Sequence, residues 1–103
     1  MTPIGIIGVG HAVPDNDVKN VDLVAMGVET TDEWIRERTG ISARRIADAD
    51  TNTSDLAIKA AQQAIDRSGI NPDDIGVVIC ATSTPDFGGF PSTACLVQRA
   101  LGL

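Results

Sequence analysis

The most restrictive feature of this sequence is an unbroken apolar run near its middle. Residues 75–81 read IGVVICA, with no charged or strongly polar side chain at any position. A strand with one face in water alternates apolar and polar residues, whereas an unbroken apolar run is typical of a strand covered on both faces. Layered α/β domains provide such cover, with helices above and below the sheet.

The rest of the chain supplies few elements that could cover this strand. A first apolar run predicts a strand over residues 4–9. Apolar positions at 3.6-residue spacing predict one long helix over residues 53–68, capped by Thr53 or Ser54 and ended by Gly69. Shorter helices are expected over residues 21–26, 31–38 and 91–101. We therefore expect residues 1–103 to be one portion of a larger α/β layered domain.

Composition and charge restrict the class of protein. The chain is 43% hydrophobic and 21% charged, a globular balance, and its net charge of −6 argues against nucleic-acid binding. No apolar run approaches the roughly 20 residues of a membrane helix, and no signal peptide is visible at the start. Two cysteines are too few for a disulfide framework. A soluble, cytoplasmic protein that does not bind membranes is expected.

Two short patterns invite functional interpretations that the sequence does not support. Gly8 and Gly10 could open a dinucleotide fingerprint, but that motif needs a third glycine where Val13 stands, followed here by Pro14. A strand end with a tight glycine turn is the favoured alternative. His11 is the only histidine, so neither a metal site nor a Ser-His-Asp set can be assembled.

A cluster of arginines surrounds the only tryptophan, Trp34. Four of the eight basic residues fall within ten positions: Arg36, Arg38, Arg44 and Arg45. One interpretation is a solvated helix face, since most surface charge runs have no other role. The other is a local cationic patch that holds a phosphate-bearing ligand while Trp34 stacks on a base.

The two cysteines are expected to be structural. Cys95 falls about one turn into the last expected helix, between small and apolar residues, with no basic side chain beside it. A reactive thiolate needs a helix N-terminus or a basic partner. A buried, inert thiol is therefore predicted at Cys95, and likewise at Cys80, which ends an apolar run.

Two long stretches resemble the N-terminal part of beta-ketoacyl-ACP synthase III. The first is TTDEWIRERTGI at residues 30–41 with RRIA at 44–47; the second is DIGVVICATSTPD at 74–86, continuing to FPSTACLVQ at 90–98. The resemblance covers nearly the whole chain. It implies the thiolase-like fold, two similar α/β halves in an αβαβα layered arrangement, usually as a homodimer. This chain would be the opening portion of the N-terminal half.

The resemblance also implies an activity, a decarboxylative Claisen condensation. In the family an active-site cysteine takes an acyl group, typically acetyl, from acyl-CoA. Malonyl-ACP then loses carbon dioxide and attacks the thioester, giving the 3-ketoacyl-ACP that starts fatty-acid synthesis. A histidine and an asparagine assist. Acyl-CoA and malonyl-ACP are substrates, the acyl carrier protein is a partner, and no cofactor or metal is implied.

Four residues of this chain match functional positions of that family. Trp34 matches the tryptophan that stacks on the CoA adenine, Arg38 an arginine that holds the nucleotide end, and Thr30 a threonine lining that site. Phe90 matches a phenylalanine at the dimer interface that reaches the partner's acyl pocket. The catalytic cysteine, histidine and asparagine have no counterparts here, and Cys95 matches a non-catalytic position.

Two alternatives stay open. The chain could belong to a related acyltransferase or condensing enzyme of secondary metabolism, or it could be a non-catalytic fragment that binds CoA or a carrier protein.

Overall fold

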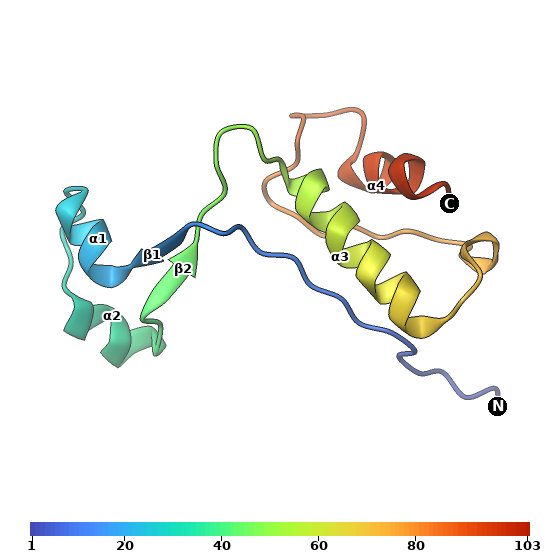
Figure 1. Cartoon of the computed structure of the whole chain (residues 1–103), viewed down its shortest axis with the longest axis horizontal. Helices are drawn as coiled ribbons and strands as arrows, with labels where there is room; N and C mark the ends of the chain where they lie inside the picture. The colour runs from blue at the N-terminus through green and yellow to red at the C-terminus, as the bar shows by residue number, and fades with distance from the viewer. The chain divides into compact units, whose positions relative to one another are not determined.

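The computed structural model describes all residues 1–103 and divides them into two compact units (Figure 1). Residues 13–50 form the first, here called the hairpin unit. Residues 1–12 and 51–103 form the second, here called the long-helix unit. We describe each unit by itself.

The hairpin unit contains two short strands and two helices. Strand β1 (Asp17–Lys19) pairs antiparallel with β2 (Ala43–Arg45), and Val18 lies opposite Arg44. Helices α1 (Asn20–Ala25) and α2 (Asp32–Thr39) lie between the two strands in the chain, close to the expected ranges. The strands were not predicted, because three residues are too few to show alternation.

Helix α2 begins and ends where its capping residues predict. The Thr31 side chain accepts a hydrogen bond from the backbone N–H of Trp34 at 3.1 Å, and this satisfies one free donor of the first turn. Gly40 follows the last turn with φ of 72°, the left-handed conformation that closes a helix. Thr31 and Gly40 therefore set the two ends of α2.

The long-helix unit is built on α3 (Thr53–Ser68), whose bounds match the prediction. The N-cap is Asn52 rather than Thr53 or Ser54, and its backbone N–H donates to the Asp55 carboxylate at 2.8 Å. A short 3₁₀ helix, η1 (Pro72–Asp74), follows, and α4 (Thr93–Leu101) closes the unit.

Residues 4–9 and 75–81 do not form the predicted strands. The only strand pairing in the structure is between β1 and β2, and both apolar segments run extended beside α3 without a ladder (Figure 1). Val78 and Cys80 are partly covered, whereas the alternate residues are open to solvent: Val77 is 75% and Ile79 is 87% exposed. A strand needs a hydrogen-bonded neighbour, and neither segment has one within residues 1–103. The expected cover on both faces is therefore absent from these residues.

The N-terminal segment is seated on α3 through its glycines. A Cβ built at Gly10 would lie 2.1 Å from the Ala60 carbonyl oxygen, so the segment approaches the helix more closely than any side chain permits. The His11 backbone N–H donates to the Gln63 side chain at 3.0 Å, and Arg67 donates to a backbone carbonyl of the segment at 3.1 Å. His11 thus has a structural contact here, through its backbone.

Candidate functional site

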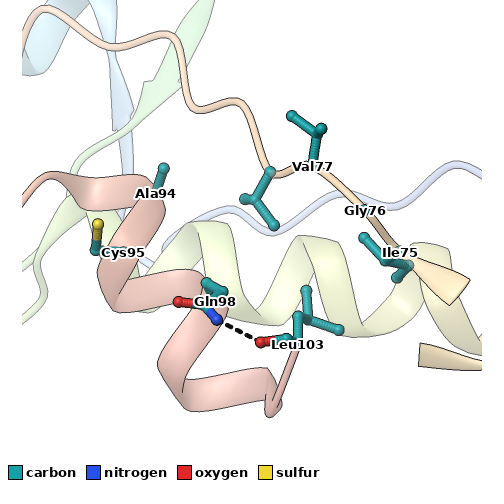
Figure 2. A pocket seen from close by; sticks show the side chains of 8 residues that line it. Ile75, Gly76, Val77, Ala94, Cys95, Gln98 and Leu103 are labelled. Carbon is teal, nitrogen blue, oxygen red and sulfur yellow. Dashed lines mark hydrogen bonds between the residues drawn. The ribbon is translucent and has the colours of Figure 1, made fainter. Parts of the chain in front are cut away.

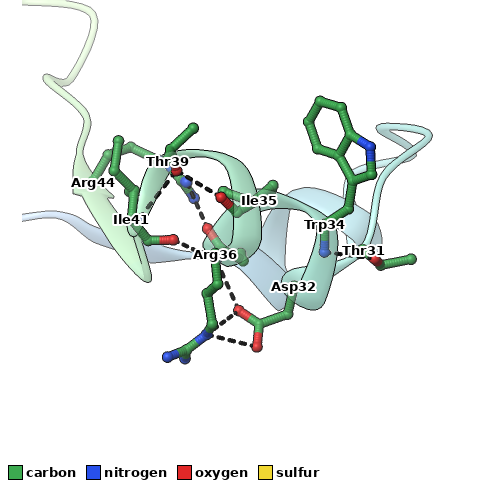
Figure 3. Close-up of polar contacts among 9 residues, drawn as sticks. Thr31, Asp32, Trp34, Ile35, Arg36, Thr39, Ile41 and Arg44 are labelled. Carbon is green, nitrogen blue, oxygen red and sulfur yellow. Dashed lines mark hydrogen bonds and ion pairs between the residues drawn. The ribbon is translucent and has the colours of Figure 1, made fainter.

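Trp34 and Arg38 form one contact on the surface of α2. They are four positions apart, so they share a helix face. The Arg38 guanidinium carbon lies 4.9 Å from the Trp34 ring centroid, a cation–π distance, and the ring is 52% exposed. Figure 3 shows this indole directed away from the side of the helix that carries Asp32 and Arg36. A large aromatic surface and a cation are therefore presented together.

A cavity of about 390 Å³ adjoins the tryptophan. Its lining residues are Glu29, Thr30, Thr31 and Trp34. The Thr30 hydroxyl oxygen is buried and has no hydrogen-bond partner in the structure. An unpartnered buried hydroxyl is costly. The structure thus brings together the three residues that the sequence nominated for one site, Thr30, Trp34 and Arg38.

Three of the four clustered arginines are engaged in contacts within the hairpin unit. Arg36 pairs with Asp32 at 2.8 Å, Arg44 donates to Asn20 at 2.6 Å, and Arg45 donates to the Pro14 and Asp15 carbonyls at 3.2 Å each. Arg38, with its contact to an aromatic ring, is the member best placed to meet a phosphate group.

A fully buried asparagine connects these elements. Asn20 has an exposed fraction of 0%. Its side-chain amide donates to the Asp32 carboxylate at 2.7 Å and to the Ile41 carbonyl at 2.8 Å, and its oxygen accepts from Arg44. Its backbone N–H donates to the Ser42 carbonyl at 3.1 Å. Asn20 is not predictable from the sequence, because no periodicity marks this polar residue as buried.

The Asp32 carboxyl predicts a pH effect on stability. The hydrogen bond from Arg36, and then that from Asn20, lower the pKa of Asp32 below its ordinary value of 3.8, while partial burial opposes them. A lowered folded-state pKa stabilises the fold above the ordinary value, and this contribution is lost as the pH falls through the folded-state pKa. We expect the unfolding free energy to decline from pH 5 to pH 3 in urea titrations. The decline should be smaller in Asp32→Asn; equal declines would contradict this assignment.

The predicted burial of Cys95 is wrong. Cys95 is exposed, and the buried positions of α4 are Thr93 and Val97 at 3% and 4% exposure. The reason is helical phase, because Cys95 lies two positions from each of them and so falls on another face. The Ser92 hydroxyl donates to the Cys95 sulfur at 3.2 Å. Cys80 is half-buried.

Cys95 borders a second cavity, of about 280 Å³, in the long-helix unit (Figure 2). Residues 75–78 form one wall, and Ala94, Gln98 and Leu103 complete the lining. These groups are mostly apolar, and no titratable partner for the thiol is among them. Phe90, the fourth nominated residue, lies in the loop before α4 and is 96% exposed. The structure therefore places Phe90 in a different unit from Thr30, Trp34 and Arg38.

Other kinds of site find no support in the structure. No group of three or more His, Cys, Asp or Glu side chains is arranged to hold a metal ion. None of the helices has the length and apolar composition that a membrane span requires.

Individual curated proteins match this chain, whereas no protein-family model does. The chain is 53% identical over 102 residues to a beta-ketoacyl-[acyl-carrier-protein] synthase III of Natranaerobius thermophilus, covering 99% of this chain and 30% of that protein. It is 52% identical over 100 residues to the synthase of the same name from Symbiobacterium thermophilum, covering 97% and 30%. The chain thus spans about 30% of the length of the curated relatives it matches.

Solved structures of similarly named enzymes also match this chain. The beta-ketoacyl-[acyl carrier protein] synthase III of Thermus thermophilus matches with a TM-score of 0.85 and 45% identity, over 97% of this chain and 30% of that one. The priming beta-ketosynthase of the R1128 polyketide biosynthetic pathway matches with a TM-score of 0.83 and 32% identity, over 94% and 28%. The thiolase-like fold class and the resemblance stated from the sequence are confirmed.

Proposed function

We propose that this chain, nearly all of which is similar to part of beta-ketoacyl-[acyl-carrier-protein] synthase III, supplies the coenzyme A nucleotide site of such an enzyme. The observation that carries the proposal is the Trp34–Arg38 contact beside the cavity that Thr30 and Trp34 line.

Each of these groups suits one part of the CoA nucleotide. The half-exposed Trp34 ring offers a flat face for the adenine base. The Arg38 guanidinium is a planar cation whose donors match phosphate oxygens. The Thr30 side chain lines the cavity beside the ring, where it can contact the base or the sugar.

The reaction we propose for the complete enzyme is condensation of an acyl-CoA, typically acetyl-CoA, with malonyl-ACP. A cysteine that lies outside residues 1–103 takes the acyl group, and a histidine and an asparagine, also outside them, assist the decarboxylation. The exposed Phe90 would then meet a second copy in a homodimer and reach its acyl pocket. The acyl carrier protein is the proposed partner, and the cytoplasm the proposed location.

A second candidate keeps the CoA site but uses another acyl group. The similarity to a priming ketosynthase of a polyketide pathway favours a condensing enzyme or acyltransferase of secondary metabolism. A non-catalytic CoA-binding or carrier-binding fragment is the third. The intact mass of the protein purified from its source distinguishes the fragment from the enzymes, and turnover of acetyl-CoA with malonyl-ACP distinguishes the two enzymes.

Removal of the Trp34 or the Arg38 side chain should weaken CoA binding in the protein purified at its natural length. Trp34→Ala removes the stacking face, and we expect about a tenfold loss of CoA affinity, or roughly 1.4 kcal/mol. Arg38→Ala should also lose affinity, and lose more at low salt, because a charge–phosphate attraction is screened by ions. Isothermal titration calorimetry measures both. Arg99→Ala in α4 removes the same charge elsewhere and should leave affinity unchanged. Unchanged affinity in both site variants would refute the assignment.

Cys95 should not carry the acyl group, although it is exposed. Its thiol accepts a hydrogen bond from Ser92 but has no base within the cavity it borders. After incubation with acetyl-CoA, mass spectrometry should find the Cys95 peptide unmodified, and Cys95→Ser should form acyl-enzyme as the parent does. A stable acetyl adduct mapped to Cys95 would overturn the view that the nucleophile lies outside this chain.

A further inference from the structure

Asn20 holds both ends of the helix that presents the candidate site. One hydrogen of its side-chain amide goes to Asp32, the first residue of α2, and the other goes to the carbonyl of Ile41, two residues after the last turn. Both N–H donors of this amide therefore bind residues at the two ends of one helix. Hydrogen bonds at both ends restrict the rotation and tilt of a helix more than a bond at one end does.

The same side chain anchors α2 to the hairpin. Its oxygen accepts from the Arg44 guanidinium at 2.6 Å, and Arg44 also donates to the Val18 carbonyl at 3.2 Å. Val18 is 4% exposed and lies in β1, so the anchor point is itself part of the packed interior. The position of α2 is thus fixed relative to the strands through one buried amide.

The anchored face and the ligand face of α2 are opposite one another. Two positions along a helix correspond to a rotation of about 200°, so Trp34 points away from Asp32. Figure 3 shows this arrangement, with the Asp32–Arg36 pair on one side of the helix and the indole on the other. Rotation of α2 would therefore swing Trp34 and Arg38 together relative to Thr30, which precedes the helix.

We propose that Asn20 is a positioning residue for the nucleotide site, which fixes the rotation of α2 so that Trp34 and Arg38 face the Thr30 cavity. This inference rests on the proposed function. It assigns to Asn20 no contact with the ligand, only control over the residues that make contact.

The test measures binding of adenosine 3′,5′-bisphosphate, the nucleotide end of coenzyme A, to the protein at its natural length. We expect Asn20→Ala to lower this affinity about tenfold in calorimetry at a temperature where circular dichroism shows the variant folded. Turnover of acetyl-pantetheine, which lacks the nucleotide, should change less than twofold. A general loss of structure would reduce both. Asn16→Ala, an exposed asparagine in the same unit, is the control and should alter neither.

A second variant covers the case in which Asn20→Ala does not fold. Asp32→Ala removes the hydrogen bond between Asn20 and the start of α2 by changing a residue that is partly exposed. The Asn20 bonds to Ile41 and Arg44 stay in place. This variant should also weaken nucleotide binding, by about fivefold, since one of two tethers is lost. Nucleotide affinity within twofold of the parent in a folded Asn20 or Asp32 variant overturns the inference. If the parent itself does not bind the nucleotide, the proposed function is the part that fails.

Discussion

Replacement of Gly10 by alanine is expected to cost the long-helix unit about 3 kcal/mol of unfolding free energy. The added Cβ would lie 2.1 Å from the Ala60 carbonyl oxygen and 2.7 Å from the Ala64 backbone nitrogen. Both atoms belong to the backbone of α3, so neither can move aside without disturbing the hydrogen bonds of that helix. The N-terminal segment must therefore move away from α3 and lose its packing against that helix.

Gly5 provides a matched control on the same segment. A Cβ at Gly5 would meet no atom within 4 Å, so Gly5→Ala should change stability by less than about 0.5 kcal/mol. Urea denaturation of the protein at its natural length, followed by circular dichroism, compares the two variants. Equal midpoints for both would show that residues 4–12 are not packed on α3 as the structure has them.

Gly10 also shows why a short glycine pattern is hard to interpret from sequence. The sequence around Gly8 and Gly10 favours a strand end with a tight turn over a phosphate-binding loop. The positive-φ glycines of the structure are Gly27, Gly40, Gly69 and Gly102, and neither Gly8 nor Gly10 is among them. Their role is close contact with a helix 50 residues away, which no local rule detects.

Helices were predictable because their signals are local. Thr31 and Ser92 cap α2 and α4 through bonds to residues three positions on, and Gly40, Gly69 and Gly102 end three helices in the left-handed conformation. Strands are different, because pairing depends on distant residues. Residues 75–81 have strand composition without a partner, whereas β1 and β2 pair with almost no strand signal.

The residues of the candidate site also differ in whether the sequence reveals them. Trp34, Arg38 and Thr30 were assigned to one site by the family resemblance, and their closeness in the chain agrees with that assignment. Asn20 could not be assigned, since its partners Asp32, Ile41 and Arg44 lie 12, 21 and 24 positions away. The phase of Cys95 was misjudged for a related reason: which face of α4 is buried depends on how it packs against α3, not on its own sequence.

The loop that leads to Phe90 is fastened to the start of α3 by a carboxylate. Asp86 accepts from the Ser54 backbone N–H at 2.9 Å and also from the Ser54 hydroxyl, and Ser54 is only 7% exposed. Beside it, the Thr53 hydroxyl donates to the Thr84 carbonyl. A negative charge at the first turn of a helix is also favoured by the helix dipole.

Asp86→Ala is therefore expected to cost about 3 kcal/mol, because two donors on a buried residue lose a charged acceptor at once. Asp86→Asn keeps one acceptor oxygen without the charge and should lose about half as much. Asp73→Ala, at an exposed position of η1, is the control and should lie within about 0.5 kcal/mol of the parent. Chemical denaturation ranks the three variants. If Asp86→Ala unfolds at the same midpoint as Asp73→Ala, the carboxylate does not hold the loop, and the position of Phe90 must be set by residues after Asp86.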